Sequence, residues 1–223
     1  MSAREDILSN IRRSLGVNGR EAPRLSAVQE RLRTAPRGVM PARGQVSGPE
    51  RVALFRAEAE RVAASVAEVA QPQDIVSEAA RYLREHNLPA TLRMGADARL
   101  AELDWSETAI EVTNGPSQGD DLNGLSHAFG AIAETGTLAM TSGPGNPTTL
   151  NFLPDNHIVV LREADLVGDA ESLWDRLRAA YGKALAPRTV NLITGPSRSG
   201  DIEQQIVLGA HGPRRLHIII LRD

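Results

Sequence analysis

Strand-like and helix-like apolar patterns alternate along residues 49–223, and this alternation constrains the fold more than any other feature of the chain. The runs 157–161 and 216–221 are apolar enough for strands that are buried on both faces. Amphipathic stretches with helical spacing lie between the strand-like runs. Strands that alternate with helices predict a mostly parallel sheet with right-handed crossovers and helices on its faces. We therefore predict an α/β fold.

The spacing of apolar residues also places the individual elements. Helical spacing predicts helices over 3–15, 97–103 and 169–181, from Ile75 to near Asn87, and from Pro49 along an apolar stripe that reaches Val69. Apolar runs of strand length predict strands over 90–94, 109–113, 137–141, 157–161, 189–194 and 216–221.

Residues 1–48 differ from the rest in charge and composition. They carry nine arginines and four acidic residues, a balance of +5, whereas residues 49–223 have a balance of −8. After the short helix, Gly16 and then Pro23, Pro36 and Pro41 interrupt any regular pattern. We therefore divide the chain into an N-terminal helix with a basic Pro-, Gly- and Arg-rich arm, 1–48, and an α/β domain, 49–223. The arm is long enough to reach a second copy, which would give a homo-oligomer.

The residue types that are absent exclude several kinds of chemistry. The chain has no cysteine, so it forms no disulfide, thiolate nucleophile or iron–sulfur cluster of its own. No run approaches the roughly 18 apolar residues that span a bilayer, and the first residues lack the apolar part of a signal peptide. We therefore expect a cytoplasmic protein with no membrane segment. The net charge of −3 argues against nucleic-acid binding, although the basic arm keeps that option open.

A segment rich in hydrogen-bond donors directly follows the predicted strand 189–194, where ligands bind in open parallel sheets. The backbone near Gly195, the hydroxyls of Ser197 and Ser199 and the guanidinium of Arg198 can grip a carboxylate or a phosphate. A helix that opens near Asp201 would add the partial positive charge of its first turn. The alternative is a strand-to-helix turn in which a serine or Asp201 only caps the helix.

A lone acid, Glu134, lies in a run of small apolar residues beside Thr135, Gly136 and Thr137. Burial favours the protonated form of a carboxyl group, and it would suit Glu134 to act as a general base, a general acid or a nucleophile. The alternative is a buried carboxylate that caps backbone amides at the turn. Glu134 is the candidate catalytic residue, and its three neighbours are candidate substrate-binding residues.

Other reactive side chains give less specific patterns. His211 lies in a loop before the last strand. It could act as a proton shuttle or a ligand, or it could be a structural residue of the turn. The five histidines lack the spacing of a metal site and no G-x-G-x-x-G follows a strand, so we expect this chain to bind no metal or cofactor. Lys183, the only lysine, is the sole candidate for a Schiff base. The G-x-S-x-G motif of serine hydrolases would need a glycine at position 199, where this chain has Ser199, so the sequence argues against a serine hydrolase.

Four short strings follow one another before the last strand. They are ETGT at 134–137, LPDNHI at 153–158, GPSRSGDIE at 195–203 and GAHGPR at 209–214. In order and spacing they resemble the LUD domain, the family of lactate-utilisation protein C, over roughly residues 50–223.

The resemblance implies a Rossmann-like sheet similar to those of ribose-5-phosphate isomerase, CoA transferases and formyltetrahydrofolate cyclo-ligase. It also implies a role in the oxidation of L-lactate to pyruvate, together with partner proteins that carry iron–sulfur clusters. The lack of cysteine fits a subunit without a cluster. Such a subunit could bind a small carboxylate such as L-lactate, with Arg198 as the clamp, or stabilise the assembly.

Two other functions stay open on the residues alone. The chain could be an independent enzyme in which Glu134 acts on a phosphosugar, a folate or a CoA ester. It could instead be an interaction or regulatory module whose basic arm binds nucleic acid, and a steep dependence of that binding on salt would reveal it.

Overall fold

Contacts divide the chain into two compact units, residues 1–39 and 40–223. The computed structural model describes residues 2–182, 187–202 and 205–222. Residues 40–48, which the sequence groups with the arm, belong to the second unit. Within the described part of the chain, no helix combines the length and the apolar character that crossing a bilayer requires.

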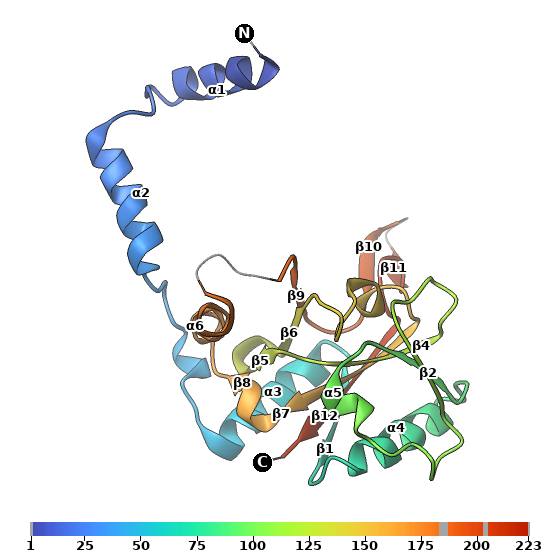
Figure 1. Ribbon diagram of the computed structural model, residues 1–223. Helices are drawn as coiled ribbons and strands as arrows, with labels where there is room; N and C mark the ends of the chain where they lie inside the picture. The colour runs from blue at the N-terminus through green and yellow to red at the C-terminus, as the bar shows by residue number, and fades with distance from the viewer. Residues whose placement is uncertain (1, 183–186, 203–204, 223) are drawn as a thin grey trace. The chain divides into compact units, whose positions relative to one another are not determined.

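The first unit contains the helices α1 (Ala3–Ser14) and α2 (Ala22–Thr34) (Figure 1). Ser2 and Glu5 form a capping box at the start of α1, in which each side chain accepts a hydrogen bond from the backbone N–H of the other residue. The expectation of an irregular arm after residue 16 is wrong at α2. Pro23 lies in the first turn of α2 and Pro36 follows its end, and proline does not break a helix at either position.

A six-stranded parallel sheet forms the centre of the second unit. Its strands, in spatial order, are β1 (Ser65–Val69), β12 (Arg215–Leu221), β7 (Asn156–Arg162), β4 (Asn123–His127), β2 (Thr91–Met94) and β3 (Glu111–Asn114). Every neighbouring pair in this sheet is parallel. The predicted α/β, Rossmann-like fold is therefore confirmed.

A smaller mixed sheet lies beside the parallel one. Its strands, in spatial order, are β8 (Leu166–Val167), β5 (Gly130–Ile132), β6 (Thr137–Thr141) and β9 (Val190–Ile193). Because β9 pairs antiparallel with β6, the segment after it does not start from the carboxyl end of a parallel strand, and that expectation is wrong. The helix considered near Asp201 is wrong too, because β10 (Arg198–Ile202) and β11 (Gln205–Leu208) form an antiparallel hairpin.

Helices and single turns cover the two sheets. The remaining elements are η1 (Ala42–Gly44), α3 (Gly48–Arg61), α4 (Asp74–Glu85), α5 (Ala98–Ala101), η2 (Ala133–Thr135), η3 (Thr148–Asn151), η4 (Glu163–Asp165) and α6 (Ala170–Tyr181). The predicted continuation of the first helical stripe to Val69 is wrong. The helix ends at Arg61, Ala63 takes a left-handed φ of 68°, and the following valine-rich stretch pairs with β12 as a strand.

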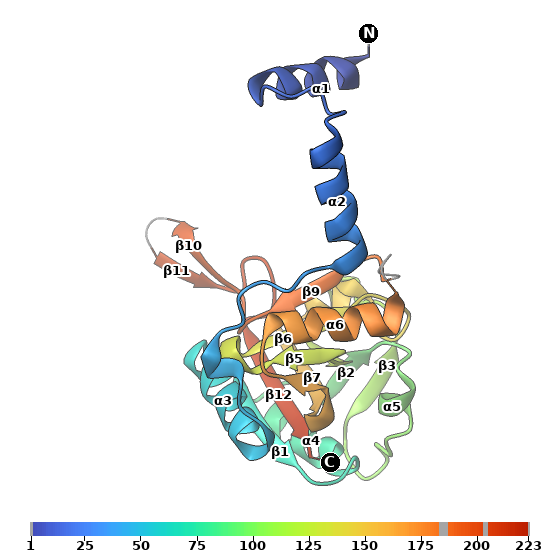
Figure 2. The same cartoon turned by 90° about the vertical axis from the view of Figure 1, so that its left-hand side faces the viewer.

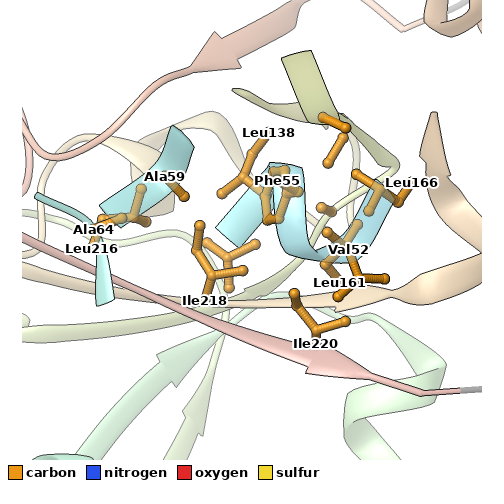
Figure 3. Packing of buried hydrophobic residues seen from close by; sticks show 14 of the residues in the cluster. Val52, Phe55, Ala59, Ala64, Leu138, Leu161, Leu166, Leu216, Ile218 and Ile220 are labelled. Carbon is orange, nitrogen blue, oxygen red and sulfur yellow. The ribbon is translucent and has the colours of Figure 1, made fainter. Parts of the chain in front are cut away.

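Alternate residues of the central strands separate two apolar cores. Leu161 and Ile218 face α3 and the smaller sheet, where they join Phe55 (Figure 3). Ile158 and Ile219 point the other way, toward α4 and α5. A third cluster joins the smaller sheet to α6, which lies across β5 and β6 (Figure 2). The layers are thus helices, the parallel sheet, the smaller sheet with α3, and α6.

Candidate functional site

Two of the predicted segments meet at the end of α3 because each contains a glycine that lies against this helix. Gly136 has a φ of 64°, and a Cβ added there would lie 2.5 Å from the backbone nitrogen of Ala59. Gly195 has a φ of 72°, and an added Cβ would lie 2.4 Å from the carbonyl oxygen of Val62. Glycine alone combines a left-handed φ with so close an approach. The two glycines therefore hold two separate segments, the one that begins at Glu134 and the one around Gly195, against the same end of α3.

An open pocket of about 610 Å³ lies where these segments meet. We call it the threonine pocket, and its lining includes Arg43, Arg61, Glu134, Thr135, Thr137 and Thr194. The Oγ1 atom of Thr137 lies 2.7 Å from Oγ1 of Thr135 and 2.7 Å from Oγ1 of Thr194. Since a hydroxyl both donates and accepts, this chain of three hydroxyls can present either a donor or an acceptor to a bound molecule.

Glu134 forms part of the wall of the threonine pocket and is only 7% exposed. Its backbone N–H donates to the carbonyl oxygen of Gly168 at 3.1 Å, which fixes the turn η2. Its Oε2 atom is buried and has no hydrogen-bond partner among the described residues. An unsatisfied buried polar atom costs about 1–3 kcal/mol, and a ligand that donates a hydrogen bond or a proton would remove that cost. Oε2 therefore caps no described backbone amide.

Two guanidinium groups at the rim of the threonine pocket share one carboxylate. Arg61 Nη2 lies 2.6 Å from Glu58 Oε2, and Arg43 Nη2 lies 3.0 Å from Glu58 Oε1. The hydrogen bond from Arg61 lowers the pKa of Glu58, with a further contribution from Arg43 against the opposing effect of burial. Two cations that share one anion leave one positive charge in excess beside Glu134. No group of three or more acidic or histidine side chains in the described chain is placed to hold a metal ion.

Ser197 and His211 lie next to each other, but neither lines the threonine pocket. Ser197 N–H donates to the carbonyl oxygen of Pro213 at 2.8 Å, and its Oγ accepts from the backbone N–H of His211 at 3.3 Å. The serine hydroxyl thus joins two loops, and the imidazole of His211 is exposed.

Arg198 and Ser199 begin the β10–β11 hairpin, and the side chain of Arg198 is exposed. Figure 1 and Figure 2 both show this hairpin projecting beyond the two sheets. The side chain of Asp201 and all of Lys183 lie outside the described part of the structure. The carboxylate clamp at Arg198 therefore stays a prediction.

A second polar cavity, of about 370 Å³, was not predicted from the sequence. We call it the edge cleft, and its lining includes Asp97, Arg99, His127, Asn146, Arg162 and Arg176. It lies at the carboxyl ends of parallel strands, because His127 ends β4 and Arg162 ends β7. A histidine or arginine as the last residue of each strand was the sequence signal for this cleft, but β4 was not predicted because Leu125 is its one strongly apolar residue.

Comparison with known protein families identifies the family of this chain. The family model described as the LUD domain matches residues 52–221. The chain belongs to the LUD domain family. The resemblance drawn from the four strings is therefore confirmed.

The relatives of this LUD domain protein include two bacterial proteins named "Lactate utilization protein C". The one from Halalkalibacterium halodurans is 34% identical over 121 residues, which is 53% of this chain and 52% of that protein. The one from Exiguobacterium sp. is 34% identical over 101 residues, which is 45% of this chain and 44% of that protein. The chain thus spans about half the length of the curated relatives that it matches.

A solved structure shares the fold of this LUD domain protein. It is the crystal structure of a DUF162 family protein from Deinococcus radiodurans, with a TM-score of 0.61 and 20% sequence identity. The match covers 79% of this chain and 99% of that protein.

Proposed function

We propose that this LUD domain protein serves lactate utilisation as a subunit without a cluster, which acts with iron–sulfur partner proteins in oxidising L-lactate to pyruvate. The names of its relatives support the pathway. The lack of cysteine in this chain agrees with clusters that are held by other subunits.

We assign the binding of a small carboxylate to the threonine pocket. The observation that carries this assignment is the buried Oε2 of Glu134, which has no partner among the described residues. A 2-hydroxy acid offers complementary groups. Its hydroxyl would donate to Glu134, and its carboxylate would accept from the threonine hydroxyls and from the guanidinium groups of Arg43 and Arg61.

This arrangement gives Glu134 a defined part in the reaction. Oxidation of lactate to pyruvate releases two protons and two electrons. Glu134 would accept the proton of the hydroxyl group, the hydrogen on C2 would leave as the second proton, and the two electrons would pass one at a time to the iron–sulfur clusters of the partner proteins. In this proposal the LUD domain positions and deprotonates the substrate, and the partner proteins carry the electrons away.

The same carboxylate also suits an independent enzyme. A buried glutamate that lines an open pocket and has one unpartnered oxygen could act as a base or acyl acceptor on a phosphosugar, a folate or a CoA ester. That alternative requires turnover by the purified chain alone, whereas the lactate proposal requires partner proteins.

A growth test separates these functions. A strain that lacks this protein is grown on L-lactate or on glucose after complementation with wild type, Glu134→Gln or Arg198→Ala. We expect loss of growth on lactate alone, restored by wild type and not by Glu134→Gln. Because Arg198 lies on the hairpin and does not line the threonine pocket, its variant separates the two candidate carboxylate sites.

The outcomes differ for the pathway and for the site. Rescue by Glu134→Gln but not by Arg198→Ala would keep the pathway and move the carboxylate site to the hairpin. Normal growth of the deletion strain on lactate, in a background without another lactate dehydrogenase, would contradict the pathway and favour the independent enzyme.

A further inference from the structure

The edge cleft lies at the point where the direction of the chain through the parallel sheet reverses. Strands β2 and β4 are neighbours. The chain leaves β2 toward β3 on one side, and it leaves β4 toward β7 on the other. At such a switch point the loops after the two strands separate, and open α/β sheets bind their ligands, nucleotides among them, in the crevice between these loops. Asp97 and Arg99 follow β2, and His127 ends β4, so both strands contribute to the cleft.

The charges of the edge cleft favour an anion. Three arginines and two aspartates line it, which leaves one positive charge in excess. Arg99 Nε donates to Asp97 at 3.0 Å, and Arg176 Nη1 donates to the carbonyl oxygen of Ala164 at 2.9 Å. These bonds hold the planar groups in place and leave other N–H groups of the same guanidinium groups for a ligand.

Two hydrogen-bond acceptors in the edge cleft favour a ligand with hydroxyl groups, because a hydroxyl group can donate to each of them. His127 Nδ1 lies 2.8 Å from the carbonyl oxygen of Ala128, which can only accept, so Nδ1 carries the proton. Burial, with the nearby charge of Arg99, lowers the pKa of His127 and keeps the ring neutral, so its Nε2 is an acceptor. Asn146 is only 7% exposed, and its buried Oδ1 has no partner among the described residues.

An apolar extension continues the edge cleft. This second cavity, of about 210 Å³, shares Arg99, His127 and Arg162 with the edge cleft. Its other lining residues are mostly apolar and include Ile75, Leu100, Val160 and Leu221, with Glu102 as the one acid. A ligand that fills both cavities therefore needs an anionic end, hydroxyl groups near its middle and an apolar or aromatic end.

We propose that the edge cleft and its extension form a binding site for a nucleoside monophosphate. The phosphate lies among Arg99, Arg162 and Arg176. The ribose hydroxyls donate to His127 and Asn146, and the base enters the apolar extension. The site is separate from the threonine pocket, and its occupation does not depend on the role proposed for Glu134.

Calorimetric titration of the full chain with AMP and with UMP tests this proposal. We expect saturable binding of at least one of them at concentrations below about 1 mM. Adenosine lacks the phosphate and ribose 5-phosphate lacks the base, so each should bind at least tenfold more weakly than AMP. Arg176→Gln and Arg162→Gln each remove a charged donor and should weaken binding by about tenfold or more. Thermal unfolding shows whether each variant is folded. If Arg176→Gln does not fold, Arg162→Gln alone tests the phosphate contact.

Arg178→Gln is the matched control. Arg178 lies on the same helix as Arg176 and, like it, pairs with an aspartate, Asp175, at 2.7 Å, but it does not line the edge cleft. Its replacement should leave nucleotide binding within about twofold of wild type. Absence of binding by both nucleotides at about 1 mM would overturn the proposal. So would equal affinities of the folded Arg162, Arg176 and Arg178 variants. Ribose 5-phosphate that binds as tightly as AMP would refute the nucleoside assignment, because the apolar extension would then contribute nothing.

Discussion

The threonine pocket and the edge cleft are built in opposite ways. Most of the polar side chains of the threonine pocket come from two short segments, which two glycines hold against one helix end. The edge cleft collects single side chains from the ends of β4 and β7, from the start of α5 and from α6, which are far apart in the sequence. The acids differ as well: Glu134 has a free buried oxygen, whereas Asp97 and Asp165 are each paired with an arginine. A site held by backbone turns is therefore visible as a string of residues, whereas a site assembled by strand order is not.

Acid should destabilise the fold through two buried histidines of the parallel sheet, to which the edge cleft belongs. Burial lowers the pKa of His157 to about 4, and burial also lowers that of His217 to about 4 against the opposing effect of Glu78. Unfolded histidine titrates near 6.5, so between pH 6.5 and 4 the unfolded chain binds more protons than the folded chain. Stability should thus fall as the pH is lowered through this window, by up to roughly 3 kcal/mol for each histidine.

Urea unfolding from pH 7 to pH 4.5 measures this loss. Because acidic side chains with lowered pKa values titrate mainly below this range, the histidines should dominate it. A free energy of unfolding that stays constant over this range would show that the buried histidines are not neutral in the folded protein.

A glycine that packs closely at the threonine pocket can be replaced, and the loss of stability can be compared with that of a glycine replaced at the edge cleft. Gly136→Ala should lower the free energy of unfolding by about 2–4 kcal/mol, because the new Cβ meets the backbone of Ala59 at a left-handed φ. Gly143→Ala is the control, since an added Cβ there has nothing within 4 Å. Thermal or urea unfolding of the two variants provides the comparison. Equal stabilities would mean that the close approach to α3 does not hold the pocket together.

The smallest expected effect comes from a comparison of Glu134, whose Oε2 has no described partner, with Asp165, which forms an ion pair. Glu134→Gln replaces a buried carboxylate that lacks a partner at Oε2, so the free energy of unfolding should be unchanged or should rise by about 1 kcal/mol. Asp165→Asn weakens an ion pair with Arg176, so it should lower this free energy by about 1 kcal/mol. Urea unfolding at pH 7 measures both. A larger loss for Glu134→Gln than for Asp165→Asn would show that Glu134 has a structural partner after all.

The sequence predicted elements with strong periodicity and missed those without it. Strand β6 was predicted with its observed bounds, and the helix predicted over 169–181 matches α6, because the apolar spacing is regular in both segments. Strand β1 was hidden because Val62, Val66 and Val69 keep helical spacing through a turn that lies at Ala63. The β10–β11 hairpin was read as the start of a helix, because a Ser-Gly-Asp sequence is compatible with either.

The same difference between local patterns and long-range packing separates the site residues that were predicted from those that were not. Glu134 and its threonines were found from the sequence because they are neighbours in one string. Arg43 and Arg61 were missed because only the packing of η1 and α3 brings them to the same pocket. The residues of the edge cleft were missed because their proximity depends on the strand order, which local patterns do not encode.

We propose that Glu134 in the threonine pocket serves lactate oxidation. The most direct measurement is the rate at which L-lactate reduces an electron acceptor in the complex assembled from this protein and its iron–sulfur partners, with wild type or Glu134→Gln. We predict that the variant assembles normally and is slower by at least about a hundredfold, the range expected when a general base is lost. An assembled Glu134→Gln complex with the wild-type rate would contradict the claim.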